Sequence, residues 1–367
     1  MAAAADTAHM QAALGLARRG LGITWPNPNV GCVLVREGRV VGRGVTACGG
    51  RPHAETVALA MAGERARGAT AYVTLEPCSH HGGTPPCADA LIAAGVARVV
   101  AAQRDPDPRV NGAGLRRLAA AGLEVVEGLL GAEAEEVTAG FLSRVRKGRP
   151  ALTLKLASTL DGRIATHGGE SRWITGADAR HASHAMRGRH DAVLIGIGTA
   201  LADNPELTCR IPSFRTRPLV RIVADSGLRL PLTAKLVATA QETPLWVLHR
   251  EGADPIRAAA LEKLGVRLFA LPAASSGIDL PAALAALGAA GLTAILAEGG
   301  AGLAAGLLRA DLVDRLAWFH APALLGADGW PAAAVLGITE LAAIPRFRRV
   351  RSLPLGEDVL TELARAH

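Results

Sequence analysis

Aromatic side chains are scarce in this chain of 367 residues, where one Tyr, five Trp and five Phe make up 3% of the sequence. A core with so few rings has to be filled mostly by Ala, Val, Leu and Ile, and apolar residues make up half of the chain. Charged residues make up 20%, an ordinary globular fraction, so the composition excludes a disordered protein. The length favours two domains over one.

Cysteine is also rare, and its five copies form an odd number in a long chain. This count does not suit a disulfide framework, so we expect reduced thiols or metal ligands in a cytoplasmic protein. Met1–Met10 has no basic region and no long apolar region, so no secretory signal is expected. The longest uncharged stretch, Leu280–Ala297, contains Pro281, Gly288 and Gly291, and its pattern indicates a helix and then a buried strand instead of a membrane span.

The chain is basic, with a formal charge of +7 and a pI near 9.7. The excess is spread evenly, and no arm is dense in Lys or Arg. A phosphorylated small molecule suits this balance as well as a nucleic acid does.

Strand-like and helix-like segments alternate along the chain. The strands expected in the first half are Val30–Val35, Arg39–Val45, Ala71–Leu75, Val96–Ala102 and Leu123–Glu127, and the helices are Ala8–Arg19, His53–Arg67, Cys87–Ala94 and Asn111–Ala121. The strands expected in the second half are Leu152–Leu156, Ala192–Ile197, Leu219–Ala224, Leu245–His249, Val266–Leu271 and Leu292–Ala297, and the helices are Ala177–Arg189, Pro255–Leu264 and Leu303–Arg309. The basic, Pro- and Gly-bearing segment Arg144–Pro150 interrupts the alternation. We therefore predict two α/β domains over residues 1–147 and 148–367, the first with a mixed three-layer sheet.

Three possible metal ligands occur in the first domain. His53 opens a predicted helix, Cys78 follows a predicted strand, and Cys87 begins the next helix. One His and two Cys are the ligands expected of a catalytic zinc ion that keeps its fourth position for water. A helix N-terminus lowers the pKa of a nearby thiol, which favours metal binding. Glu55 lies on the same helical turn as His53, so we expect it to act as general acid and base on metal-activated water.

Less specific explanations compete with this interpretation. A His-Ala-Glu triplet occurs often by chance, and a Cys in an Ala-rich helix is usually a core residue. A structural zinc site would need a fourth Cys or His, for which His80 and His81 in a Gly- and Pro-rich loop are the nearby candidates. Cys32 is expected in the core, and Cys48 and Cys209 are expected to be structural thiols.

The sequence around the metal ligands resembles a known family. The general zinc-deaminase pattern, H-x-E followed by P-C-x-x-C, is met only in part, because the two cysteines are nine residues apart. However, the run AYVTLEPCSHHG at 71–82, TPPC at 84–87, PNPNVG at 26–31 and GAT at 68–70 resemble the deaminase half of the bifunctional riboflavin-biosynthesis enzymes.

This resemblance implies a cytidine-deaminase-like domain that binds Zn²⁺ and removes ammonia from 2,5-diamino-6-(5-phosphoribosylamino)pyrimidin-4(3H)-one. It also implies that Asn27 lies at the edge of the pyrimidine, where its amide can both donate and accept a hydrogen bond. Asn29 is expected to be a turn residue.

Two positions depart from the family: Thr46 stands where members usually have His, and Gly83 stands where they usually have Lys or Arg. Both places help to bind substrate in the family, so the departures concern substrate contacts and leave the chemistry intact.

A second set of motifs lies in the second domain. It consists of LKLASTLDG at 154–162, ESRWIT at 170–175, GIGT at 196–199, ADNP at 202–205 and EGG at 298–300. The last motif joins a strand to a helix and presents free backbone N–H groups that suit a pyrophosphate, although Gly-Gly there is as often only a tight turn. As a set, these motifs resemble the reductase half of the same family, so the resemblance spans nearly the whole chain.

The reductase resemblance implies a dihydrofolate-reductase-like α/β fold and an NADPH-dependent reduction that converts the ribosyl group to ribityl, giving 5-amino-6-(5-phosphoribitylamino)uracil. The residues implied for the NADPH site are Ala157, Trp173, Thr199, Asp203, Ser226, Gly300, Ala301, Gly302, Leu303, Ala304, Ala305 and Gly306. Those implied for the substrate are Ser171, Arg187, Leu207, Arg210 and Glu298. The forked guanidinium groups of Arg187 and Arg210 suit the oxygens of a ribose phosphate.

Lys155 is one of four lysines and lies in an otherwise apolar strand. Burying an unpaired Lys is costly, so we expect Lys155 to reach the active cleft and contact substrate. The alternative is a solvent-exposed Lys on an edge strand.

Together the motifs predict a bifunctional enzyme of riboflavin biosynthesis that uses Zn²⁺ and NADPH on a phosphorylated pyrimidine, without a nucleic-acid or membrane partner. We expect a homo-oligomer, either a dimer or a tetramer. A nucleic-acid deaminase would need a basic or aromatic-lined groove, and the few aromatics form no such cluster in the sequence. A zinc-stabilised binding protein would neither need Glu55 nor bind NADPH.

Overall fold

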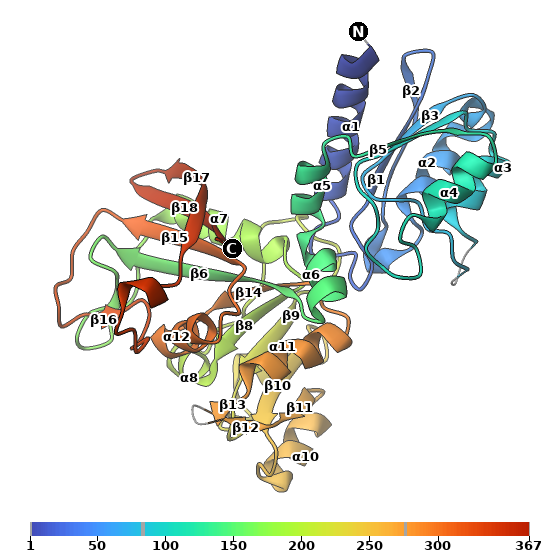
Figure 1. Ribbon diagram of the computed structural model, residues 1–367. Helices are drawn as coiled ribbons and strands as arrows, with labels where there is room; N and C mark the ends of the chain where they lie inside the picture. Colours follow the sequence, from blue (N-terminus) through green and yellow to red (C-terminus); the bar gives the residue numbers. More distant parts are fainter. Residues whose placement is uncertain (1, 82–84, 275–276, 367) are drawn as a thin grey trace. The chain divides into compact units, whose positions relative to one another are not determined.

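The computed structural model describes residues 2–81, 85–274 and 277–366 (Figure 1). The chain divides into two compact units, Met1–Gly148 (unit 1) and Arg149–His367 (unit 2). Each unit has its own sheet and its own core.

Unit 1 is built on a five-stranded sheet with the order β2-β1-β3-β4-β5. Its strands are β1 (Gly31–Arg36), β2 (Arg39–Val45), β3 (Thr70–Val73), β4 (Arg98–Ala101) and β5 (Glu124–Glu127). β1 pairs antiparallel with β2 and β3, whereas β3, β4 and β5 are parallel. The β1–β2 hairpin turns through Glu37 and Gly38, both with positive φ. Because the sheet contains both antiparallel and parallel pairs, the predicted mixed sheet is confirmed.

Helices cover both faces of this sheet. They are α1 (Ala2–Arg18), α2 (Ala54–Ala62), α3 (Cys87–Ala93), α4 (Ala113–Ala120), α5 (Gly131–Val137) and α6 (Ala139–Lys147). Side chains of α1 and α5 share one core cluster with the sheet, and side chains of α2, α3, α4 and α6 share the other. The small residues allow close packing: a Cβ on Gly44 would lie 2.0 Å from the carbonyl oxygen of Ala54 in α2. Unit 1 therefore has three layers with few aromatic rings.

Unit 2 contains a nine-stranded sheet with the order β11-β10-β9-β8-β14-β6-β15-β18-β17. Its strands are β6 (Ala151–Thr159), β8 (Ala192–Gly196), β9 (Val220–Ala224), β10 (Leu245–Arg250), β11 (Arg267–Leu271), β14 (Ala294–Glu298), β15 (Arg315–Ala321), β17 (Phe347–Leu355) and β18 (Asp358–Arg365). Neighbouring strands from β11 to β15 are parallel, and β18 and β17 continue the sheet in antiparallel fashion.

The order of these strands creates a binding position. The chain moves outward from β6 through β8 to β11, and later returns to insert β14 between β8 and β6. Ligands of open α/β sheets bind beyond the carboxyl ends of strands where the order reverses in this way. The helices of unit 2 are α7 (Ala177–Gly188), α8 (Ile197–Asp203), α9 (Lys235–Ala238), α10 (Pro255–Lys263), α11 (Leu280–Ala289) and α12 (Ala301–Arg309).

The long uncharged stretch forms a helix and then a strand, α11 and β14, as its pattern predicts. Among the described residues, no helix combines the length and apolarity that crossing a membrane requires. Short two-stranded pairs complete unit 2, formed by β7 (Arg163–Ala165) with β16 (Trp330–Pro331) and by β12 (Ala273–Ala274) with β13 (Gly277–Ile278).

Candidate functional site

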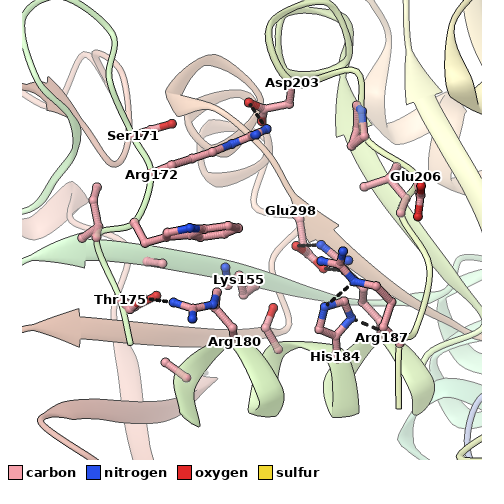
Figure 2. A pocket seen from close by; sticks show the side chains of 18 of the residues that line it. Lys155, Ser171, Arg172, Thr175, Arg180, His184, Arg187, Asp203, Glu206 and Glu298 are labelled. Carbon is pink, nitrogen blue, oxygen red and sulfur yellow. Dashed lines mark hydrogen bonds and ion pairs between the residues drawn. The ribbon is translucent and has the colours of Figure 1, made fainter. Parts of the chain in front are cut away.

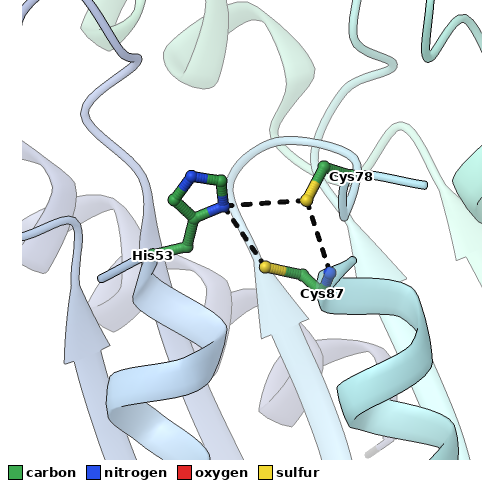
Figure 3. A group of neighbouring side chains, drawn as sticks. All are labelled: His53, Cys78 and Cys87. Atoms are coloured by element: carbon green, nitrogen blue, oxygen red, sulfur yellow. Dashed lines mark hydrogen bonds between the residues drawn. The ribbon is translucent and has the colours of Figure 1, made fainter. Parts of the chain in front are cut away.

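The structure brings His53, Cys78 and Cys87 together in unit 1 (Figure 3). His53 caps α2, Cys78 lies in the loop after β3, and Cys87 is the first residue of α3. His53 Nδ1 is 3.7 Å from Cys78 Sγ and 3.3 Å from Cys87 Sγ. Tetrahedral zinc, with bonds of about 2.1 Å to nitrogen and 2.3 Å to sulfur, separates two such ligand atoms by about 3.6 Å. The donor set and its spacing therefore fit zinc.

The two thiols differ in acidity. Hydrogen bonds from the Cys87 thiol, from His53 and from the Cys87 N–H lower the pKa of Cys78 to about 4, although burial opposes this shift. The Cys87 N–H begins α3 and lies 3.3 Å from Cys78 Sγ, so the helix N-terminus supplies one of these donors. The hydrogen bond with Cys78, together with burial, raises the pKa of Cys87. Cys78 is therefore the more acidic of the two thiols, and metal binding would release the protons that the ligands still carry.

Glu55 lies beside these ligands in the first turn of α2, and only 3% of it is exposed. Burial, followed by the charge of Cys78, raises the pKa of Glu55 to about 7. A carboxyl group with this pKa can accept and donate a proton near neutral pH. The site thus combines a metal donor set with an acid–base group that is not a ligand.

Across residues 2–81, 85–274 and 277–366, no fourth His, Cys, Asp or Glu joins this metal cluster. His80 and His81 lie outside the cluster, so the alternative of a four-ligand structural zinc site is not supported. Cys32 is wholly buried in β1, as predicted.

The two asparagines of the Pro26–Val30 loop make different contacts. Asn27 Nδ2 donates to the Gly50 carbonyl at 2.9 Å, so the amide keeps its oxygen for another partner. Asn29 is buried, and its Nδ2 donates to the carbonyls of Ala17 at 3.3 Å and Val137 at 3.1 Å. The prediction of a simple turn residue at Asn29 is wrong, because this side chain cross-links α1 to α5.

Of the two positions that depart from the family pattern, the structure describes Thr46 but not Gly83. Thr46 follows β2 and is buried, and its Oγ1 accepts a hydrogen bond from the Val30 N–H at 3.0 Å. Its side chain is therefore used to close the end of the β1–β2 hairpin. Gly83 lies outside the described residues.

Glu76 is a buried residue that the sequence motifs do not single out. Its carboxylate accepts backbone hydrogen bonds from Asp105 at 3.2 Å, Gly112 at 2.8 Å, Gly114 at 2.9 Å and Leu115 at 3.4 Å. These donors come from the loop before α4 and from the first turn of that helix. Glu76 therefore fixes this loop beside the segment that carries Cys78, and its position directly before Pro77-Cys78 is the signal that could have indicated the role.

A cavity of about 500 Å³ lies in unit 2 (Figure 2). Of the residues predicted for cofactor or substrate, it is lined by Lys155, Ala157, Ser171, Trp173, Arg187, Asp203, Leu207, Arg210 and Glu298. One face of α7 also lines it, through Ala179, Arg180, Ser183, His184 and Arg187. The motifs miss Arg180, Ser183 and His184, whose helical spacing from Arg187 is the signal that could have found them.

Three charged side chains meet in this cavity. Arg187 forms a two-pronged ion pair with Glu298, at 2.6 Å from Nε and 2.9 Å from Nη2. Burial alone would raise the pKa of Glu298, but Arg187 and Lys155 lower it below its usual value, so this carboxylate is ionised. Burial lowers the pKa of Lys155, against the opposing effect of Glu298. Lys155 lies on β6 between β14 and β15, so the edge-strand alternative is wrong.

Trp173 is a large exposed side chain in the same cavity, with 67% of its surface accessible. The Arg180 guanidinium lies 4.7 Å from its ring centroid, and the Arg172 guanidinium lies 6.0 Å away. Arg172 also pairs with Asp203 at 3.2 Å, which links the Trp173 segment to the end of α8.

The remaining predicted cofactor residues lie at the ends of neighbouring strands or in the helix α12 that follows one of them. Helices α8 and α12 begin after the adjacent strands β8 and β14, and Thr199 Oγ1 accepts a hydrogen bond from the Gly300 N–H at 3.2 Å. Two helix N-termini beside each other suit an anionic group such as a pyrophosphate. Ser226 follows β9, the next strand of the sheet. Ala304 and Ala305 are buried in the core, so their predicted contact with the cofactor is not supported.

Two family models match the chain. The cytidine and deoxycytidylate deaminase zinc-binding region matches residues 3–103, and the RibD C-terminal domain matches residues 150–361. The first range contains the His53, Cys78 and Cys87 cluster, and the second contains the cavity of unit 2.

Individual relatives match over nearly the full length. The chain is 44% identical to the riboflavin biosynthesis protein RibD of Escherichia coli K12 over 377 residues, which cover 98% of this chain and 100% of that protein. The structure of Acinetobacter baumannii RibD aligns with a TM-score of 0.88 at 38% identity and 100% coverage of both chains. The Thermotoga maritima diaminohydroxyphosphoribosylaminopyrimidine deaminase/5-amino-6-(5-phosphoribosylamino)uracil reductase aligns with a TM-score of 0.87 at 34% identity, also with full coverage.

Proposed function

The chain belongs to the RibD family of bifunctional riboflavin-biosynthesis deaminases and reductases, and from this premise we propose which of its residues perform each reaction. Unit 1 deaminates 2,5-diamino-6-(5-phosphoribosylamino)pyrimidin-4(3H)-one. Unit 2 then reduces the ribosyl group of the product to ribityl. The cofactors are Zn²⁺ and NADPH.

In unit 1, His53 Nδ1 and the sulfurs of Cys78 and Cys87 hold Zn²⁺. Bound zinc supplies the Lewis acidity that makes water a nucleophile at neutral pH. The Glu55 carboxylate removes the proton from that water and returns it to the nitrogen that leaves as ammonia. The Asn27 amide oxygen, which stays free of the Gly50 contact, accepts a hydrogen bond from the edge of the pyrimidine.

In unit 2, Lys155 is the proton donor. Trp173, Asp203, Thr199 and the start of α12 at Gly300 would hold NADPH, which when bound would supply the hydride chemistry needed at C1′ of the ribosyl group. As the bond between C1′ and the ring oxygen breaks, the Lys155 ammonium gives a proton to that oxygen, which becomes a hydroxyl group. Burial lowers the pKa of Lys155 and so makes it a better acid. Glu298 stays ionised beside it and is fixed by Arg187.

We assign the binding of the substrate's ribose phosphate to Arg210 alone, instead of to Arg187 and Arg210 together. The Arg187 fork is already paired with Glu298. Arg210 lines the same cavity and, among the described residues, forms no ion pair with a carboxylate.

The observation that supports this function most strongly is the buried Glu55 beside a His-Cys-Cys donor set. The test is incubation of the zinc-loaded chain with the diaminopyrimidine phosphate, with and without NADPH. Ammonia should appear in both reactions, and NADPH oxidation should follow only where NADPH is supplied. Ammonia release without any NADPH oxidation would contradict the reductase assignment, and the absence of both would contradict the proposal.

A further inference from the structure

His184 lies in the cavity of unit 2 on α7, one helical turn before Arg187, and Figure 2 shows both side chains. Its two ring nitrogens face different groups. Nδ1 is 3.1 Å from the Thr208 carbonyl oxygen and 3.3 Å from the Arg210 backbone nitrogen, and Nε2 is 3.1 Å from Nε of Arg210. No sequence motif indicates this contact, because His184 and Arg210 are far apart in the chain.

The contact with Arg210 fixes the protonation state of the imidazole. A guanidinium nitrogen can only donate, so Nε2 of His184 has to accept and cannot carry a proton. A neutral ring has one acceptor nitrogen, and the shorter, charge-assisted contact at Nε2 takes that role in place of the 3.3 Å contact between the Arg210 backbone N–H and Nδ1. The single proton is then on Nδ1, where it is donated to the Thr208 carbonyl. A second proton would place an N–H of the ring against the N–H of Arg210, and two positive charges would face each other.

The surroundings keep His184 neutral. Burial, followed by the charges of Arg187 on α7 and Arg210 on the following segment, lowers the pKa of His184. Glu298 at the end of β14 acts in the opposite direction but is itself paired with Arg187. Lys155 on β6 adds another cation to the lining of the cavity.

We propose that neutral His184 is a positioning residue, which orients the Arg210 guanidinium to receive the phosphate of the reductase substrate. His184 takes up Nε of Arg210 and leaves the two terminal nitrogens for phosphate oxygens, a bidentate arrangement that guanidinium groups favour. This inference rests on the proposed function of unit 2, in which Arg210 binds the ribose phosphate. It also predicts that acid weakens phosphate binding, because protonated His184 releases and repels Arg210.

Three variants of the holoenzyme test the proposal. His184→Ala removes the acceptor, whereas His184→Gln offers an amide oxygen that can accept from Arg210 but does not titrate. His181→Ala, at an exposed position on the same helix and outside the cavity lining, is the control. Each variant is assayed by NADPH oxidation with the already deaminated phosphoribosyl substrate between pH 5.5 and 8.

At pH 7.5, His184→Ala should raise the substrate KM by about 10-fold, as expected when one charge-assisted contact loses its orientation. The kcat and the KM for NADPH should stay within about 2-fold, because the phosphate lies away from the reacting carbon. His184→Gln should restore most of the lost affinity, and His181→Ala should resemble the unaltered enzyme.

The pH profile separates positioning from a general packing role. The substrate phosphate itself gains a proton near pH 6, and this raises KM equally in all variants. The unaltered enzyme should show an additional rise of KM in acid, and His184→Gln should lack it. The proposal is overturned if His184→Gln keeps the full rise of KM in acid. It is also overturned if His184→Ala lowers kcat and weakens the binding of NADPH as much as the binding of substrate.

A double-mutant comparison completes the test. His184→Ala should have no further effect on KM in an Arg210→Ala background, because both changes remove the same contact. Calorimetric binding of inorganic phosphate to the unaltered chain and to His184→Ala gives a measurement without turnover, in which equal affinities would contradict the proposal. Failure of the unaltered chain to oxidise NADPH would instead contradict the proposed function.

Discussion

Burial moves two titratable side chains toward neutrality from opposite directions, Glu55 upward in unit 1 and Lys155 downward in unit 2. In each case the low-dielectric surroundings disfavour the charged form. The result is a carboxyl group that can hold a proton and an ammonium group that can lose one. These are the properties required of an acid–base pair in hydrolysis and of a proton donor in reduction.

Replacing Glu55 by Gln should abolish ammonia release and leave reduction of the deaminated substrate near normal. Loss of general acid–base catalysis costs about 10²- to 10⁴-fold in kcat. The zinc content should not change, because Glu55 is not a ligand. Ammonia release and NADPH oxidation, measured separately on the same preparation, check this expectation, and a parallel loss of both activities would contradict it.

Replacing Lys155 by Met should lower the reductase kcat by about 10²-fold or more, since the proton donor is removed. In the proposed mechanism Lys155 acts in its protonated form, and its pKa lies below the ordinary value because it is buried. Reductase kcat should therefore fall as the pH rises through this lowered pKa, earlier than for an ordinary lysine. A pH profile that is flat well into the alkaline range would refute the assignment, and unchanged ammonia release in Lys155→Met is the internal control.

At the scale of elements, the Glu76 carboxylate of unit 1 holds the loop before α4 together with the first turn of that helix. Glu76 collects four backbone N–H groups from residues 105–115 and lies two residues before Cys78. Amides at the beginning of α4 are among these donors, so the carboxylate also complements the helix dipole. We therefore expect the geometry of the proposed metal ligands to depend on this buried carboxylate, although it is not one of them.

Glu76→Gln should speed the loss of zinc to a chelator by about 10-fold or more, the size of effect seen when residues that orient metal ligands are changed. An amide in this place offers one acceptor oxygen and turns an NH₂ group toward backbone donors. Glu64→Gln, at an exposed position after α2, is the matched control. Hydrogen exchange at Gly112 and Gly114 should quicken in Glu76→Gln alone. Identical rates of zinc loss in both variants would show that the hydrogen bonds of Glu76 do not support the metal site.

Elements with strong local patterns could be predicted from the sequence. The β1–β2 hairpin, the buried parallel strands and α7 match the alternation and helical periodicity of their residues. β17 has no such pattern, because Phe347–Leu355 is an exposed outer strand rich in Arg that depends on its pairing with β18. The short helix α5 was also missed, since its seven residues are mainly small or acidic and it is held by packing against α1.

The site residues also divide into those that have a local sequence signal and those that depend on distant contacts. His53, Cys78, Cys87 and Glu55 could be found because their residue types and spacing carry the chemistry locally. Position alone could have drawn attention to Glu76 and His184, but their partners could not be predicted, because each contacts backbone or side chains of a distant segment. Their roles depend on tertiary contacts that a single sequence does not display.

At the scale of the molecule, each chemistry has its own sheet, core and polar cluster within one of the two units. Arg149, the first residue of unit 2, pairs with Asp314 of the same unit at 2.7 and 3.0 Å. This bond fixes the start of β6 by contacts internal to unit 2. The described residues that line the cavity all belong to unit 2, so none of His53, Cys78 and Cys87 contributes to it.

Removal of the metal by a chelator should stop ammonia release by the whole chain and spare NADPH oxidation with the deaminated substrate. Unit 1 should also lose thermal stability, because bound metal stabilises the folded state. Restoring Zn²⁺ should recover ammonia release. A proportional fall of both activities on chelation would show that the reductase depends on the metal.

The exposed Trp173 ring, which lies near two guanidinium groups in the cavity of unit 2, has an optical consequence. Unit 1 contains a single Trp, Trp25, whereas unit 2 contains the other four. An indole beside a bound reduced nicotinamide can pass its excitation energy to that ring, whose own emission then reports occupancy. Tryptophan excitation should therefore show the cofactor entering unit 2 in real time without any label, and Trp173→Phe should weaken that signal most.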